Sequence, residues 1–96
     1  MLELRQLKAF VAIAEEGYIT RAAERLGMQQ PPLTRLLQSL EAELGVVLME
    51  RLPRGVRPTT AGLALLEEAR HILASVDGVA DIVRRAARGE RGRLAI

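Results

Sequence analysis

Cysteine is absent from this 96-residue chain, which excludes a disulfide framework and a thiolate metal site. The N-terminus lacks the basic and then apolar profile of a signal peptide, and no apolar run approaches the roughly 20 residues that cross a bilayer. A chain of this length buries one small core, so a second packed domain is not expected. These absences predict a soluble protein of the reducing cytoplasm with no membrane partner.

Aromatic residues and lysine are scarce. Phe10 and Tyr18 are the only aromatic residues, too few for a platform that stacks single-stranded nucleic acid. Lys8 is the only lysine among 14 basic residues. Arginine suits planar, bidentate contact with phosphate and guanine, although a GC-rich genome gives the same bias. The net charge of +2 predicts no affinity for polyanions by itself.

Patterns that indicate catalysis or metal binding are also missing. His71 is the only histidine, and it shares a helix face with Glu67 and Ser75 at a spacing typical of ordinary surface pairs. No glycine-rich phosphate loop follows a strand, and no His/Cys/Asp cluster has the spacing of metal ligands. We therefore expect neither an enzyme nor a cofactor.

Helical periodicity covers most of the chain. Apolar residues at steps of three and four predict a first helix that ends at Gly17, and a short second helix over residues 20–26 is followed by Gly27. Pro31 and Pro32 mark the start of a third helix, because proline is tolerated in a first helical turn. The apolar face of the first helix consists of Leu4, Leu7, Phe10, Val11 and Ala14.

The third helix, which we place at residues 31–43, has two unlike faces. Four leucines lie along one line and predict its buried side, whereas the opposite face is polar or small and would meet something outside the domain. Leu36 lies at the boundary, where partial burial and contact with a thymine methyl group are both open. The leucines are Leu33, Leu37, Leu40 and Leu44, and the outer face carries Pro31, Arg35, Gln38, Ser39 and Ala42.

The pattern changes in the segment "VVLMERLPRGVRPTT". Its β-branched and apolar residues around a turn at 53–55 predict a small β-hairpin. Arg51, Arg54 and Arg57 lie on this hairpin, and only Glu50 opposes them nearby. The hairpin is therefore the densest positive patch of the chain.

A long helix follows the hairpin. Thr59 or Thr60 would cap it, and its apolar residues form a heptad seam as far as about Arg88. A seam this long exceeds what the small domain covers, which predicts a homodimer; packing on the first helix of the same chain is the alternative. The seam consists of Gly62, Leu65, Ala69, Ile72, Val76, Val79, Val83 and Ala86. The expected dimer interface consists of Leu65, Ala69, Ile72, Val76, Val79 and Val83.

The segment "TRAAERLGMQQPPLTRLLQSL" predicts a helix-turn-helix. Ala23, Gly27 and Leu33 occupy the positions at which two helices approach closely, turn and lock together. The arginine-rich hairpin downstream fits a wing that would contact the DNA backbone or the minor groove. The second helix of such a motif enters the major groove with its N-terminal residues at base edges.

Individual side chains then take roles in DNA contact. Gln30 could bond adenine and Arg35 guanine, each through two hydrogen bonds. Thr34 could contact a base or a phosphate, whereas Thr20 and Arg21 at a helix start would face phosphate. The alternative for each is a solvated polar side chain. The full predicted set is Thr20, Arg21, Gln30, Pro31, Pro32, Thr34, Arg35, Gln38, Arg51, Arg54 and Arg57.

Three segments, "LRQLKAFVAIAEEG", "TRAAERLGMQQPPLTRLLQSLEAELGVVLMER" and "RGVRPTTAG", together resemble the N-terminal DNA-binding domain of LysR-type transcriptional regulators. The resemblance covers essentially the whole chain. It implies a mainly α fold, in which residues 1–58 form a winged helix-turn-helix with a small β-hairpin wing and residues 59–88 form a linker helix that pairs with a second subunit. Residues 89–96 contain two glycines and a strand-like run from Leu94. They would be the hinge and first strand of a missing effector-binding domain.

The resemblance also implies a function: sequence-specific binding of double-stranded operator DNA in a bacterial transcription regulator. Helix 31–43 would lie in the major groove and wing 51–57 on the backbone or minor groove, with a dimer on an interrupted inverted repeat. The full-length parent could form a tetramer, and a small-molecule effector would bind only the missing domain. Family positions that face operator DNA are Thr20, Gln30, Pro31, Thr34, Arg35 and Arg54. The alternative is a helical protein-interaction module with no specific DNA binding.

Three residues depart from the family's pattern. Tyr18 stands where a small hydroxyl residue is usual, so either the second helix lacks its usual cap or Tyr18 itself contacts phosphate. Leu36 replaces a polar residue, often glutamine, and Met49 replaces a phenylalanine but should still pack under the wing. The segments "QPPLT" and "LGVVL" look most like members that control aromatic-compound catabolism.

Overall fold

A computed structural model describes residues 1–89 of the chain. Four helices and one hairpin make up this part, which confirms the mainly α fold. The strand predicted from Leu94 and the break at Gly92 lie outside the described residues. The elements are α1 (Leu4–Glu16), α2 (Ile19–Leu26), α3 (Gln30–Leu44), β1 (Met49–Arg51), β2 (Val56–Pro58) and α4 (Thr60–Ala87).

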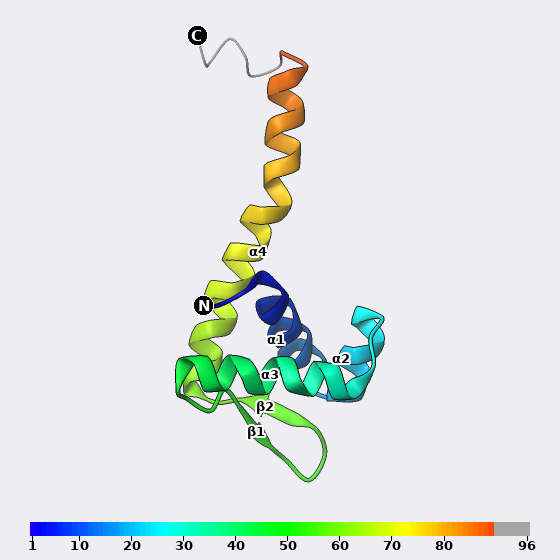
Figure 1. Cartoon of the computed structure of the whole chain (residues 1–96), viewed down its shortest axis with the longest axis vertical. Helices are drawn as coiled ribbons and strands as arrows, with labels where there is room; N and C mark the ends of the chain where they lie inside the picture. The colour runs from blue at the N-terminus through cyan, green and yellow to red at the C-terminus, as the bar shows by residue number, and fades with distance from the viewer. Residues whose placement is uncertain (90–96) are drawn as a thin grey trace.

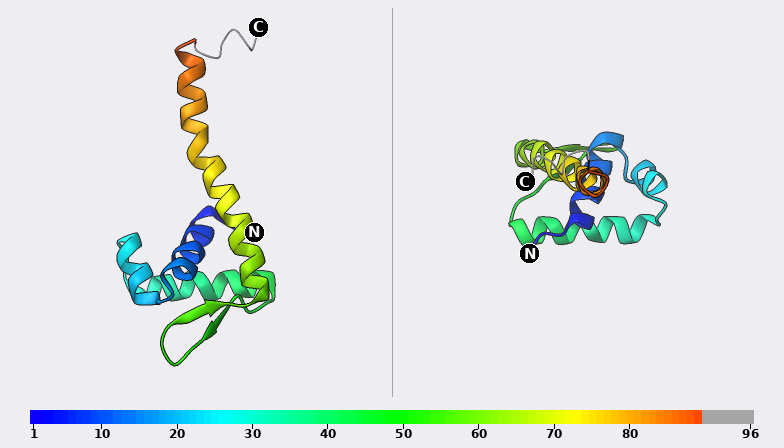
Figure 2. Two further views of the ribbon diagram at one scale, coloured as in Figure 1. Left: turned by 180° about the vertical axis from the view of Figure 1, so that it is seen from behind. Right: turned by 90° about the horizontal axis from the view of Figure 1, so that it is seen from above.

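The molecule consists of a small body and one projecting helix. In Figure 1, α1, α2, α3 and the β1–β2 hairpin lie together at one end, and the second half of α4 extends away from them. The view from above in Figure 2 shows α3 along one side of this body, with α1 behind it and α2 at its end. The extents of 56 × 26 × 20 Å reflect the projection. Among residues 1–89, the second half of α4 therefore extends beyond the other elements.

The helix boundaries follow the sequence signals. α1 and α2 end at Gly17 and Gly27, as the sequence predicts, and α3 ends at Gly45, slightly beyond the predicted range of 31–43. α3 begins at Gln30, and the two prolines that follow fill its first turn, where an N–H would have no intrahelical partner. Thr59 caps α4, because its hydroxyl oxygen accepts the N–H of Gly62 at 3.1 Å.

The core joins Leu7, Phe10 and Val11 of α1 to the inner face of α3. Leu4, which the sequence places on the same apolar face, is 45% exposed at the first residue of α1. Ala22 and Ala23 of α2 are buried against it, and such small side chains permit close helix approach. The prediction for Leu44 is wrong, since this residue is 39% exposed: it lies in the last turn of α3, beyond the body that covers the other three leucines. The largest fully buried side chains are Phe10, Ile13, Leu33, Leu40 and Leu48.

Hydrogen bonds of polar side chains connect α3 to α1 and to the hairpin. Gln6 is the only buried polar residue of the described core, and its Nε2 donates to Ser39 Oγ at 3.1 Å. The carboxylate of Glu41 accepts the N–H groups of Leu48, at 2.8 Å, and Met49, at 3.3 Å. These bonds fix the direction of α3 relative to both α1 and the hairpin.

The hairpin is short and antiparallel. Met49 pairs with Pro58, and the other two pairs bring Glu50 opposite Arg57 and Arg51 opposite Val56. The side chain of Met49, the first residue of β1, is buried on the side of the hairpin that faces the body, as expected for a residue that replaces a phenylalanine. The hairpin therefore presents an apolar side to the body and its arginines to solvent.

The predicted seam of α4 divides into two parts. Gly62 and Ala69 are buried in the body, and Leu65 is half-buried against the core. The prediction that Ala69 contacts a second chain is therefore wrong, because its side chain is covered by its own domain. From residue 72 onward Leu73 is still half-buried against the core. The other large apolar side chains are exposed, namely Ile72, Val76, Val79, Ile82 and Val83.

Candidate nucleic-acid interface

Three separate segments meet around one hollow on the surface. The start of α2, the start of α3 and the hairpin enclose a space of about 280 Å³. Thr20, Gln30 and Arg51, which the sequence places in three different elements, all line it. The remaining lining residues are Tyr18, Ile19, Leu52, Pro53, Gly55 and Val56. The fold thus gathers a hydroxyl, an amide and a guanidinium group within one concave surface.

The outer face of α3 continues from this hollow. Gln30, Pro31, Arg35 and Gln38 are exposed, and Thr34 is half-buried. Their orientation follows from the helical period, because the leucines on the opposite side are anchored in the core. The predicted base-contacting side chains therefore point away from the domain's own interior.

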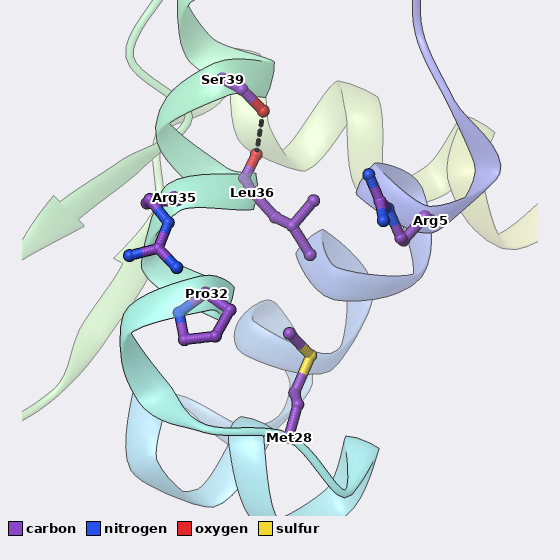
Figure 3. A pocket seen from close by; sticks show the side chains of 6 residues that line it. All are labelled: Arg5, Met28, Pro32, Arg35, Leu36 and Ser39. Atoms are coloured by element: carbon purple, nitrogen blue, oxygen red, sulfur yellow. Dashed lines mark hydrogen bonds between the residues drawn. The ribbon is translucent and has the colours of Figure 1, made fainter.

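A second hollow flanks α3 on the side of α1 (Figure 3). Pro32 and Leu36 are half-buried in it, and Ser39 Oγ donates to the Leu36 carbonyl oxygen at 2.9 Å. In Figure 3 the side chain of Leu36 extends toward Arg5 of α1, and Arg35 borders the same hollow from the outer face of α3. Of the two interpretations of Leu36, partial burial is the one that the packing against the core supports.

The three arginines of the hairpin are exposed but not equivalent. Arg57 Nε forms a salt bridge with Glu50 Oε1 on the paired strand, so part of its charge is already compensated. Arg51 and Arg54 form no salt bridge among residues 1–89. Available positive charge is therefore concentrated at the end of β1 and in the turn.

Tyr18 lies at the start of α2, beside Arg21 and beside the turn of the hairpin, and both belong to the predicted DNA-contact surface. It has extended backbone angles at the N-cap position, and its side chain makes no capping hydrogen bond, so the usual cap is lacking. The guanidinium carbon of Arg21 lies 4.4 Å from the centre of the Tyr18 ring. This distance is typical of a cation–π contact.

The hairpin is attached to the turn between α1 and α2. The N–H of Val56 donates to the Gly17 carbonyl oxygen at 2.9 Å. Gly55 has a φ of 82°, and a Cβ there would overlap that same oxygen and lie 3.2 Å from Tyr18 Cε1. Sequence reasoning missed this attachment; the only signal for it was the tyrosine in place of a small hydroxyl residue.

Other chemistry is not apparent in the described part of the chain. His71 is exposed on α4 and lines a shallow hollow with Leu63, Leu66, Glu67 and Arg70. Within residues 1–89, no group of three or more His, Cys, Asp or Glu side chains could hold a metal ion. No helix in that range is both long and apolar enough to cross a membrane.

The architecture is that of a winged helix-turn-helix, and comparison with known sequences agrees. The family described as "Bacterial regulatory helix-turn-helix protein, lysR family" matches residues 4–63. The chain is 53% identical over 95 residues to the HTH-type transcriptional regulator TcbR of Pseudomonas sp. (strain P51) and 50% identical to ClcR of Pseudomonas putida. Each match covers 99% of this chain and 32% of the relative. This chain spans about a third of the length of those relatives.

Solved structures give the same result. A crystal structure of a CbnR_DBD-DNA complex matches with a TM-score of 0.84 and 53% identity, over 90% of this chain and 99% of that chain. A BenM_DBD/benA site 1 DNA complex matches with a TM-score of 0.87 and 43% identity, over 92% and 99%. This chain belongs to the LysR family of bacterial regulatory helix-turn-helix proteins.

Proposed function

We propose that this chain is the DNA-binding part of a bacterial LysR-type transcriptional regulator and binds double-stranded operator DNA in a sequence-specific manner. The observation that carries the proposal is the convergence of Thr20, Gln30 and Arg51 on one hollow beside the exposed face of α3. Related domains with 53% and 43% identity have been solved as DNA complexes, which supports it. As part of a regulator of bacterial genes, the protein would act in the cytoplasm by binding, without catalysis.

In the proposed complex, α3 lies in the major groove. Arg35 offers two N–H groups to the O6 and N7 atoms of guanine, and Gln30 offers a donor and an acceptor to adenine. The prolines at 31 and 32 have no N–H and present a compact surface to the bases. Thr34 contacts a base or phosphate, and Gln38 lies one turn further along the helix.

Proposed contacts with the DNA backbone lie on both sides of α3. Thr20 and Arg21 lie in the first turn of α2, where the helix dipole adds partial positive charge toward a phosphate. On the other side, the wing at residues 51–57 brings Arg51 and Arg54 to the backbone or minor groove. Arg57 contributes less, because Glu50 already compensates its charge.

The exposed apolar side of α4 supports a homodimer. The proposed interface contains Ile72, Val76, Val79 and Val83, whose side chains are between 42% and 60% exposed in the single chain. Leu65 borders it. Such a row of solvent-exposed apolar residues at heptad spacing is stabilised when a second helix covers it.

The charges on α4 favour an antiparallel pair. Glu67 and Glu68 lie toward its start, whereas Arg84 and Arg85 lie toward its end. An antiparallel pair with its twofold axis at Val76 brings the acidic segment of one helix beside the basic segment of the other. A parallel pair would instead place like charges together.

The remaining assignments concern the parent protein. We propose that residues 1–58 are the winged helix-turn-helix domain, that 59–88 are the linker helix and that 89–96 lead into an effector-binding domain. A small-molecule effector would bind that domain, and the parent could assemble as a tetramer. Two copies of the chain would contact half-sites of an interrupted inverted repeat, about one helical turn or a multiple of it apart.

In vitro selection of bound duplexes from a random pool tests the proposal. We expect enrichment of an interrupted inverted repeat, together with an affinity that falls steeply as salt concentration rises. A pool without enrichment would instead support the alternative, a helical protein-interaction module without specific DNA binding.

A further inference from the structure

Tyr18 occupies a position that connects two of the proposed DNA-backbone contacts. One face of its ring carries the Arg21 guanidinium at 4.4 Å, and its Cε1 and Cδ1 atoms lie 3.2 and 3.3 Å from where a Cβ on Gly55 would be. Arg21 belongs to α2, and Gly55 belongs to the wing turn. A single half-buried side chain therefore touches both elements.

The cation–π contact leaves Arg21 able to bind an anion. The contact uses the charge of the guanidinium group and not a hydrogen-bond acceptor, so its N–H groups can still donate to phosphate oxygens. Among residues 1–89, Arg21 forms no salt bridge that would compete. The ring thus fixes the side chain without consuming its hydrogen-bonding capacity.

The ring edge of Tyr18 lies beside the turn of the wing. Gly55 lies so close to Gly17 and Tyr18 that any side chain at position 55 would force the turn away. The hydrogen bond from the Val56 N–H to the Gly17 carbonyl oxygen, at 2.9 Å, holds the next residue to the same segment. The Gly17 carbonyl group and the Tyr18 ring together border the turn that carries Arg54.

We propose that Tyr18 is a positioning residue for DNA-backbone binding: it orders the Arg21 guanidinium and the wing turn before the duplex arrives. This inference rests on the proposed function. Ordering a long side chain in advance avoids part of the entropy that binding would otherwise cost. Tyr18 acts through its ring, so its hydroxyl group is not required.

The test uses the 96-residue chain and the duplex selected with the wild-type protein, with affinity measured by fluorescence anisotropy at several salt concentrations. Tyr18→Leu keeps apolar bulk beside Gly55 but removes the π face. We expect it to weaken binding roughly threefold to tenfold. The slope of log K against log salt should become shallower by up to about 0.9, the value for one phosphate contact, because the unordered Arg21 side chain makes that contact only part of the time. Tyr18→Phe is the matched control and should retain the wild-type slope.

A double-mutant cycle with Arg21→Gln separates positioning from general stability. If the ring acts through Arg21, Tyr18→Leu should weaken binding less in the Arg21→Gln background than in the wild type. Independent, multiplicative effects of the two substitutions, or an unchanged salt slope for Tyr18→Leu, would overturn the proposal. A lower melting temperature with the wild-type slope would show a merely structural role and overturn it too.

Two further outcomes are informative. If Tyr18→Leu does not fold, Arg21→Gln alone leaves the ring and wing in place, and it should still make the slope shallower by about 0.9; an unchanged slope would refute the inference. If the wild-type protein binds no duplex, the proposed function fails and this inference fails with it. Wild-type binding with a normal Tyr18→Leu variant refutes the inference alone.

Discussion

Arg70 of α4 forms a two-point salt bridge with Glu15 near the end of α1: its Nε and Nη2 atoms lie 2.9 and 2.8 Å from Glu15 Oε2. The other carboxylate oxygen of Glu15 lies 2.9 Å from Nη2 of Arg25 in α2. One carboxylate thus connects three helices at the point where α4 leaves the body. The direction in which the proposed linker helix projects is fixed partly by this group.

The Glu15 carboxylate should make stability depend on pH. The hydrogen bond from Arg70, followed by the contacts with Arg25, lowers the pKa of Glu15 below its ordinary value of 4.5 in the folded state. A group whose pKa is lowered on folding stabilises the protein above its unfolded-state pKa, and this contribution disappears as pH falls through the folded-state pKa. Acid should therefore weaken the attachment of α4 to the body.

Glu15→Gln tests this expectation. Because the pairs are largely exposed to solvent, we expect the free energy of unfolding at neutral pH to fall by only about 0.5 to 1 kcal/mol, as measured by urea denaturation. The difference from wild type should vanish well below pH 4. Glu24→Gln is the control, since Glu24 is exposed on α2 and forms no salt bridge among the described residues. Equal effects of the two substitutions would contradict the assignment.

Gly55→Ala should displace the wing. A Cβ at this position overlaps the Gly17 carbonyl oxygen, and the φ of 82° disfavours any side chain. We expect a loss of about 1 to 3 kcal/mol in stability and weaker DNA binding. Gly27→Ala is the matched control: Gly27 has a similar φ of 67° but open space around it, so only backbone strain of about 1 kcal/mol applies. Equal losses for the two variants would refute the packing argument.

The helices and the outer face of α3 could be predicted because their signals are local. Glycines at 17, 27 and 45 end three helices, and the three- and four-residue spacing of leucines determines which side of α3 is buried. Arg35 is exposed for the same reason. The proposed base-contacting residues Gln30 and Arg35 were thus predicted from periodicity and from the chemistry of base edges.

Contacts between distant segments could not be predicted in this way. Glu15 and Arg70 are separated by 55 positions, and nothing in their local sequence distinguishes them from other surface charges. The seam of α4 looks the same in sequence whether a residue packs on its own domain or on a second chain. Ala69 was misassigned for that reason. For Tyr18, the sequence left open a missing helix cap or a contact with phosphate, but it did not indicate the position of the ring beside the wing.

Arg35→Ala should weaken binding to the selected duplex and relax its sequence preference. A bidentate contact with guanine contributes about 1 to 3 kcal/mol, so the loss should appear at one position of each half-site. Arg5→Ala is the control, because Arg5 lines the same hollow but extends from α1 (Figure 3). Repeating the selection with both variants compares their preferences. Unchanged affinity and preference for Arg35→Ala would remove Arg35 from the base-contacting set.

Val76→Asp should dissociate the proposed dimer. Val76 is 45% exposed in the single chain, and in an antiparallel pair centred on it two aspartates would face each other across the axis. Sedimentation equilibrium at micromolar concentration should show a dimer for the wild type and a monomer for the variant. Asp77→Ala, at the neighbouring position outside the seam, should remain dimeric.

The DNA-binding body does not include residue 76, so Val76→Asp should keep the melting transition of the wild type. It should bind a single half-site, with lower affinity than the intact dimer binds the full repeat. A wild-type protein that sediments strictly as a monomer would refute the interface.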